Sequence, residues 1–123
     1  MIKEIEIKEV ATAEDFSKAK ALILEYVQWL GIDLSFQSFD SEINNLAEIY
    51  SSPNGGLCIV LLNGKAVGVA GIKRFNDKEC EVKRMYVQPS SRGLGIGKML
   101  LTHCIEIAKR LQYEKMKLDT AGF

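Results

Sequence analysis

Seven consecutive residues have the types and spacing to bind a phosphate group: Arg92, Gly93, Leu94, Gly95, Ile96, Gly97 and Lys98. They join an apolar, β-rich run, Val82–Val87, to an amphipathic helix expected to begin near Gly95. Glycine permits positive φ and lets the backbone come close to a ligand. The N–H groups of residues 93–98 would then point outward at a helix N-terminus, which favours anions. With the fixed positive charge of Arg92, the pattern predicts a pyrophosphate site.

Two well-known phosphate-binding motifs do not fit this stretch. In a G-x-G-x-x-G dinucleotide motif the last glycine would fall at Lys98, counting from Gly93, or at Leu100, counting from Gly95. A P-loop needs glycine where Arg92 stands and serine or threonine where Met99 stands. An ordinary glycine-rich turn between a strand and a helix is the remaining alternative.

The spacing R-x-x-G-x-G, directly after Met85, Tyr86 and Val87, resembles the acetyl-CoA pyrophosphate loop of the GNAT superfamily of N-acetyltransferases. Residues 80–87 and 117–120 are also similar to two strands of a small bacterial-type GNAT subgroup, so the resemblance covers nearly the whole chain. It implies that Met85, Tyr86 and Val87 bind the pantetheine of acetyl-CoA through their backbone, as in strand addition. Lys98 would add charge near the phosphates, or would simply be a solvated helix residue.

Composition limits the other classes of function. The 123 residues suit one domain, 1–123, and the 16 basic and 16 acidic residues give no net charge. Nothing predicts a nucleic-acid or membrane partner, and the charged start of the chain is not typical of a signal peptide. Three cysteines, Cys58, Cys80 and Cys104, lack metal-ligand spacing. We therefore expect reduced thiols, a cytoplasmic location and no metal.

The elements that must position the loop follow from periodicity. The sequence predicts strands at 2–10, 57–62, 66–72, 79–87 and 116–119, and helices from Thr12 or Ala13 to Gly31, over 39–50 and over 95–111. Asn63-Gly64 is a strong hairpin signal. The order β-α-α-β-β-β-α-β predicts an α+β fold, a mixed, mostly antiparallel sheet flanked by helices, which is also the GNAT order.

The implied reaction is acetyl transfer from acetyl-CoA to an amine of a small molecule or peptide by direct attack. The amine must be neutral, which at pH 7 costs about 4.6 kcal/mol for a lysine-like amine and about 1.4 kcal/mol for an α-amine. Glu81 is the candidate base, because the family often uses a glutamate on this strand. A solvent-facing glutamate paired with Lys83 or Arg84 is the alternative, and Glu79 is the weaker candidate.

Several other residues have competing interpretations. His103 lies on the apolar stripe of the helix 95–111, where a packed core histidine is favoured over a catalytic one. Cys104 on the same stripe is interpreted as a small hydrophobe. Four residues border the loop where the family usually binds its acceptor: Trp29, Asp33, Phe36 and Phe39. Core packing explains the three aromatic residues equally well, and Asp33 could bind a cationic amine.

The end of the chain departs from the family pattern. GNAT members normally continue past the fifth strand with a helix, which usually carries a tyrosine that protonates the leaving thiolate, and two more strands. Here Asp119-Thr120 is followed directly by Ala121-Gly122-Phe123, so we expect a C-terminally shortened domain in which either the helix is deleted or the sequence is truncated at this point. The alternative function is a degenerate GNAT domain that binds CoA without turnover and acts as an interaction module. An open edge along residues 116–120 also predicts a homodimer.

Overall fold

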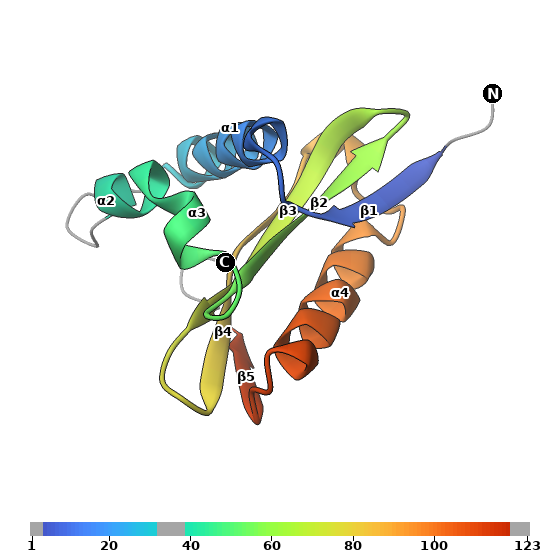
Figure 1. Ribbon diagram of the computed structural model, residues 1–123. Helices are drawn as coiled ribbons and strands as arrows, with labels where there is room; N and C mark the ends of the chain where they lie inside the picture. The colour runs from blue at the N-terminus through green and yellow to red at the C-terminus, as the bar shows by residue number, and fades with distance from the viewer. Residues whose placement is uncertain (1–3, 32–38, 119–123) are drawn as a thin grey trace.

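The computed structural model describes residues 4–31 and 39–118 (Figure 1). The strands are β1 (Ile5–Glu9), β2 (Gly56–Leu62), β3 (Lys65–Arg74), β4 (Glu79–Val87) and β5 (Lys115–Leu118). The helices are α1 (Ala13–Leu30), α2 (Phe39–Asn44), α3 (Leu46–Ile49) and α4 (Ile96–Arg110), with a 3-10 turn at Pro89–Ser91. This confirms the predicted α+β class and its order, except that the second predicted helix is divided in two.

The strands form one sheet in the order β1-β2-β3-β4-β5. Neighbours are antiparallel from β1 to β4, whereas β5 pairs in parallel with β4, because α4 returns the chain across the sheet before β5 begins. At the β2–β3 turn Asn63 and Gly64 have φ values of 52° and 84°. Both residues therefore adopt the positive φ that a two-residue hairpin of this kind requires, as predicted.

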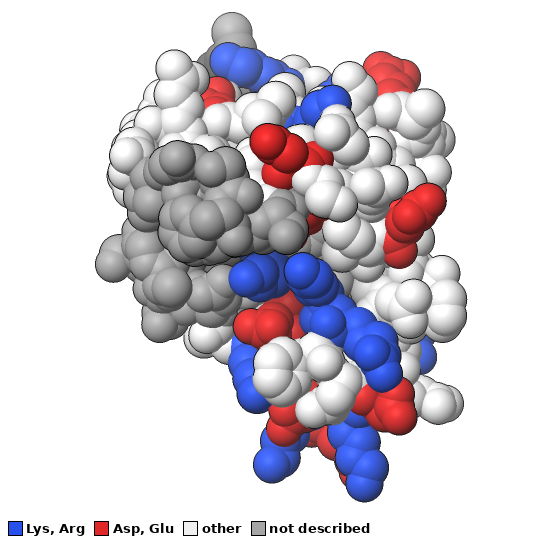
Figure 2. All heavy atoms as spheres, turned by 90° about the vertical axis from the view of Figure 1, so that its left-hand side faces the viewer, with Lys and Arg blue, Asp and Glu red and all other residues white. Residues whose placement is uncertain are grey.

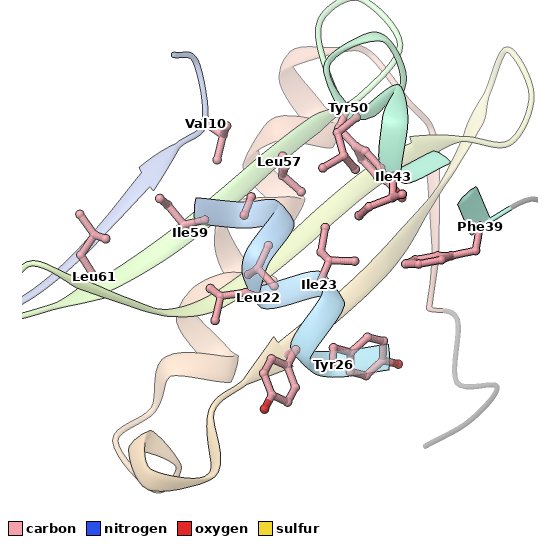
Figure 3. Packing of buried hydrophobic residues seen from close by; sticks show 14 residues of the cluster. Val10, Leu22, Ile23, Tyr26, Phe39, Ile43, Tyr50, Leu57, Ile59 and Leu61 are labelled. Carbon is pink, nitrogen blue, oxygen red and sulfur yellow. The ribbon is translucent and has the colours of Figure 1, made fainter. Parts of the chain in front are cut away.

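Helices cover both faces of the sheet, which places a hydrophobic cluster on each side (Figure 1). On one side α1, α2 and α3 pack over residues such as Leu57, Ile59 and Leu61 (Figure 3). On the other side α4 packs Ile96, Leu100, Cys104 and Ile107 against the sheet. This arrangement explains the continuous apolar run in β2. Helices cover both faces of the sheet at this strand, so successive side chains are buried whichever face they point to.

Local signals in the sequence fix the ends of the helices. At the start of α1 the Thr12 Oγ1 accepts a hydrogen bond from the Asp15 backbone N–H at 3.1 Å, and the Asp15 carboxylate accepts one from the Ala11 N–H at 3.3 Å. This pair resembles a capping box, except that the Asp15 carboxylate bonds to the residue before the N-cap Thr12. At the other end Gly31 adopts φ 68° and stops the helix, as predicted.

The predicted helix over 39–50 ends early, at Asn44, and a second short helix begins at Leu46. Asn45, between them, has φ −130°, and its side-chain amide donates to the Ser41 carbonyl at 2.7 Å. Asparagine competes for backbone partners in this way, so an apolar pattern that continues through it does not guarantee a continuous helix. Predictions that fall on Ile2, Asp33, Phe36 and residues 119–123 lie outside the described residues.

Charges of both signs are interspersed on the surface. Figure 2 shows Lys and Arg beside Asp and Glu at the lower end of one face, where the β3–β4 hairpin lies. Ion pairs there include Arg74 with Asp77 and Lys117 with Glu79. Of the helices that the structure describes, none has the length and apolar content to span a lipid bilayer.

Candidate functional site

A cavity of about 480 Å³ lies where β4 ends, α4 begins and the last turns of α1 pass over both. From β4 and α1 it is lined by Met85, Tyr86, Val87, Tyr26 and Trp29. The remaining lining comes from the glycine-rich turn and the first residues of α4: Arg92, Gly93, Gly95, Ile96 and Gly97. The structure therefore brings together eight of the ten cofactor-binding residues predicted from the sequence.

The start of α4 offers free backbone donors to this cavity. Gly95 precedes the helix with φ 79°, ψ 13° and no side-chain cap, and the first helical bond runs from the Met99 N–H to the Gly95 carbonyl at 3.1 Å. The N–H groups of the intervening residues have no acceptor one turn back within the helix. A Cβ added to Gly93, Gly95 or Gly97 would meet nothing within 4 Å, so all three lie in open space. Such a helix end suits an anion.

Arg92 places a positive charge on the wall of the same cavity. Its Nε donates to the Val87 carbonyl at 3.1 Å, which ties the side chain to the end of β4. Its guanidinium carbon lies 4.9 Å from the centre of the Trp29 ring, within the range of a cation–π contact. Arg92 is exposed, so the charge faces both solvent and any bound anion.

The wall formed by α1 and β4 is held by a second polar contact. The buried Tyr86 hydroxyl donates to Glu25 at 2.6 Å, and the Gln88 side-chain amide donates to the other carboxylate oxygen at 3.1 Å. Burial and this bond to Glu25 raise the pKa of Tyr86 to about 12, so it is a neutral hydrogen-bond donor at physiological pH. Tyr26 and Trp29 of α1 pack against the Tyr86 ring, with ring centres 5.6 and 6.2 Å apart, so α1 and β4 together form the aromatic wall.

A β-bulge in β4 lies next to the cavity. The register with β3 passes from Gly71↔Lys83 to Val69↔Tyr86, so that two residues, Arg84 and Met85, stand opposite Ala70 alone. Neither of them has a partner among the described residues of β5, whose pairing with β4 ends at Val82. The bulge thus frees backbone groups for a ligand that carries amides or carbonyls.

Arg84 is the residue that makes the bulge, and its side chain is buried against α2. The guanidinium donates two hydrogen bonds to the carboxylate of Glu42, from Nε at 2.7 Å and from Nη2 at 3.2 Å. Burial alone would raise the pKa of Glu42, but the hydrogen bonds and charge of Arg84, with Tyr50 and Lys73, outweigh it and hold that pKa below its ordinary value. Glu42 is therefore ionised at neutral pH, and so is Arg84.

Glu81 lies four residues before Met85 on β4 and does not line the cavity. It alternates with Cys80 and Val82, which face α4, so it points to the opposite side of the sheet, the side of α2 and α3. It is half-buried, and its side chain has no hydrogen bond or ion pair with any other residue in 4–31 or 39–118. The alternative interpretation is a Glu81 paired with Lys83 or Arg84. Arg84 does not pair with Glu81, because its partner is Glu42.

Other predicted residues lie elsewhere. Leu94 packs against the α4-side core, and Lys98 lines a separate hollow beside His103 and Glu106. His103 is half-buried, with Nδ1 4.0 Å from the Glu106 carboxylate, so the interpretation as a core histidine is wrong: its position on α4 is at the rim of the packed face. Cys104 is fully buried, as predicted.

Sequence reasoning missed Tyr26 and Trp29 as lining residues of the cavity. They lie three residues apart on α1, so both project from one side of the helix. That spacing was available in the sequence, but the contact of α1 with the end of β4 is long-range. Among the described residues, no three His, Cys, Asp or Glu side chains come together as a metal site would need.

Comparison with known proteins shows which family this chain and its fold resemble. Residues 19–122 match the model of the acetyltransferase (GNAT) family. An uncharacterized N-acetyltransferase from Schizosaccharomyces pombe is 37% identical over 118 residues, which cover 94% of this chain and 72% of the relative. A GNAT-family acetyltransferase from Staphylococcus aureus Mu50 superposes with a TM-score of 0.78 at 25% identity, over 95% of this chain and 73% of that one. A predicted acetyltransferase from Clostridium acetobutylicum, solved with acetyl-CoA, superposes with a TM-score of 0.68 at 20% identity, over 95% and 81%.

Proposed function

Because this chain belongs to the GNAT family of acetyltransferases, we propose that it transfers an acetyl group from acetyl-CoA to an amine of a small molecule or peptide. The observation that carries the proposal is the cavity, which joins an uncapped helix N-terminus and Arg92 at one end to the unpaired backbone of β4 at the other. One end suits a pyrophosphate and the other suits a chain of amides. The Clostridium acetobutylicum neighbour, which has the same fold, was solved with acetyl-CoA.

The residues present fit such a ligand. The backbone N–H groups of residues 93–98 and the Arg92 guanidinium would hold the phosphates, each N–H bond to a charged oxygen contributing about 1.5–3 kcal/mol. Backbone groups of Met85, Tyr86 and Val87 would hold the amide-bearing arm. When bound, acetyl-CoA supplies the activated acyl group as a thioester.

The acceptor amine attacks the thioester carbonyl carbon, so a C–N bond forms while the C–S bond breaks and CoA leaves with the sulfur. The amine has to lose a proton, and Glu81 is our candidate for the group that takes it, directly or through water. Its position on β4, half-buried and without an ion pair to another described residue, supports this role. A positioned base of this kind contributes about 10²–10⁴ in rate.

The test combines binding with turnover. Acetyl-CoA at 100 times its Kd stabilises a protein by about 2.7 kcal/mol, which a thermal melt detects. Gly95→Val should abolish that shift, because a β-branched side chain at φ 79° disturbs the loop and blocks the backbone. The matched control is Gly64→Val in the β2–β3 hairpin, where φ is 84° and a Cβ likewise meets nothing within 4 Å. It should carry similar strain and keep the shift.

Turnover is then measured with a panel of amines and mass detection of the acetylated products. Product formation with at least one amine is the expected result. A wild-type protein that shows neither a shift with acetyl-CoA nor any product would refute the proposal. Binding without product for every amine would instead indicate a CoA-binding module. The predicted cytoplasmic location and the predicted homodimer remain proposals beside it.

A further inference from the structure

The β4 bulge contains a backbone conformation that its sequence does not favour. Arg84 has φ 59°, in the left-handed region that residues other than glycine, asparagine and aspartate rarely adopt. Residues held in such conformations persist only where the surrounding structure fixes them, and they cluster at functional sites. The next residue, Met85, lines the cavity. A strained residue thus adjoins the place where the acyl end of the ligand would lie.

The contacts of the Arg84 side chain explain how this conformation is fixed. Its two hydrogen bonds to Glu42 are bidentate, at 2.7 and 3.2 Å, and its guanidinium lies 5.3 Å from the centre of the Phe39 ring. The Tyr50 hydroxyl donates to the same carboxylate at 3.1 Å, and the Lys73 ammonium lies 3.8 Å from it. Side chains from α2, β3 and the end of α3 therefore anchor one residue of β4.

Stability alone does not account for this arrangement. Glu42 is 5% exposed and the Arg84 side chain 9%, so both charges have lost most of their hydration. A buried ion pair of this kind is often no more stabilising than apolar residues of similar volume. Its distinctive property is geometry, because a bidentate Arg–carboxylate contact fixes distance and orientation together.

We propose that Glu42 and Arg84 are positioning residues, whose ion pair holds the β4 bulge in the shape that binds the acetyl thioester. This inference rests on the proposed function. The backbone of Arg84 and Met85 has no register partner on β3 or on the described part of β5. Along β4, these two residues lie farther than Val87 from the end of the cavity that suits phosphates. Arg84 itself is buried between α2 and the sheet, so it acts through its backbone.

The proposal predicts a specific defect in ligand discrimination. A bulge of the correct shape binds the thioester carbonyl, so the wild-type protein should bind acetyl-CoA more tightly than CoA by about fivefold, the value of one net hydrogen bond. Without the ion pair this ratio should fall to about one. Affinity for CoA itself should change less than twofold, because the phosphate end of the cavity is untouched.

Two variants separate positioning from folding. Replacing both partners, in Glu42→Leu with Arg84→Met, removes the pair without leaving an unpaired buried charge. The buried Tyr50 hydroxyl loses its acceptor, so the protein should melt somewhat lower but stay folded while losing the ratio. Arg84→Lys keeps the charge and loses the two-pronged geometry, and it should also lower the ratio. The matched control is Glu9→Gln, which breaks another bidentate pair, with Arg110 at 2.9 and 2.7 Å, away from the cavity.

Isothermal titration of each protein with acetyl-CoA and with CoA gives the ratio directly. A wild-type ratio near five that falls to one in both variants, with Glu9→Gln unchanged, supports the proposal. A ratio that survives in the folded variants overturns it, as does an equal loss of affinity for both ligands or a wild-type ratio of one. A wild-type protein that binds neither ligand would refute the proposed function as well. Failure of the positioning proposal alone differs from this result, because the wild-type protein then still binds acetyl-CoA and CoA.

Discussion

Substituting Gly97 by alanine should move stability and ligand binding in opposite directions. Gly97 is the second residue of α4, and a Cβ there meets nothing within 4 Å. Alanine in a helix is favoured over glycine by about 0.5–1 kcal/mol. With an unfolding entropy of about 2.1 cal/mol/K per residue, the free protein should melt about 2–4 °C higher.

The same methyl group would stand where the pyrophosphate approaches the helix. Loss of one N–H bond to a charged oxygen, about 1.5–3 kcal/mol, corresponds to a Kd about 10–150 times higher. At an acetyl-CoA concentration of 100 times the wild-type Kd, the ligand stabilises the wild-type protein by about 2.7 kcal/mol. In Gly97→Ala the same concentration should contribute only about 0.3–1.4 kcal/mol.

The assay is a thermal melt of each protein with and without acetyl-CoA at that fixed concentration. Ser17→Ala, at an exposed position of α1 outside the cavity lining, is the matched control. It should raise the melting temperature of the free protein through helix propensity and keep the full ligand shift. A Gly97→Ala protein whose ligand shift equals that of the wild type would refute the assignment of the phosphates to this helix end.

Three further predictions concern residues outside the loop. Glu81→Gln should lower kcat at pH 7 by about 10²–10⁴, with a smaller loss at high pH where the amine deprotonates itself, and an equal loss at every pH would contradict a base role. Because Glu42 has its folded-state pKa below the ordinary 4.5, the unfolded chain takes up its proton first as pH falls. The unfolding free energy of the wild type should therefore drop more steeply as the pH falls below about 5 than that of Glu42→Leu with Arg84→Met. The same pH dependence in urea denaturation of both proteins would exclude this contribution. Leu118, 57% exposed on the edge strand β5, should contribute to a homodimer that Leu118→Lys shifts toward monomer in light scattering, and a dimer that this change leaves intact would contradict an interface at β5.

The central part of the fold could be predicted because its signals are local. The apolar run that ends at Val87, the glycines after Arg92 and the stripe of α4 each lie within one element or turn, and the structure joins them as expected. The Asn63-Gly64 hairpin could be predicted for the same reason, since two adjacent residues determine the turn.

The features that sequence did not predict depend on contacts between distant segments. Arg84 and Glu42 are 42 positions apart, and nothing near Arg84 in the sequence indicates positive φ or a buried partner. Trp29 reaches the cavity only because α1 packs over the end of β4. The break at Asn45 depends on one side-chain bond that an apolar pattern does not encode.

The most direct test of the central claim is to map acetyl-CoA onto the backbone amides. The chain of 13.7 kDa is suited to two-dimensional nitrogen–proton NMR, in which each amide reports on its own environment. Titration should shift the amides of Gly93, Gly95 and Gly97 most strongly, followed by those of Met85 and Val87. Saturation by acetyl-CoA that leaves the three glycine amides unmoved, with shifts concentrated elsewhere, would contradict the account.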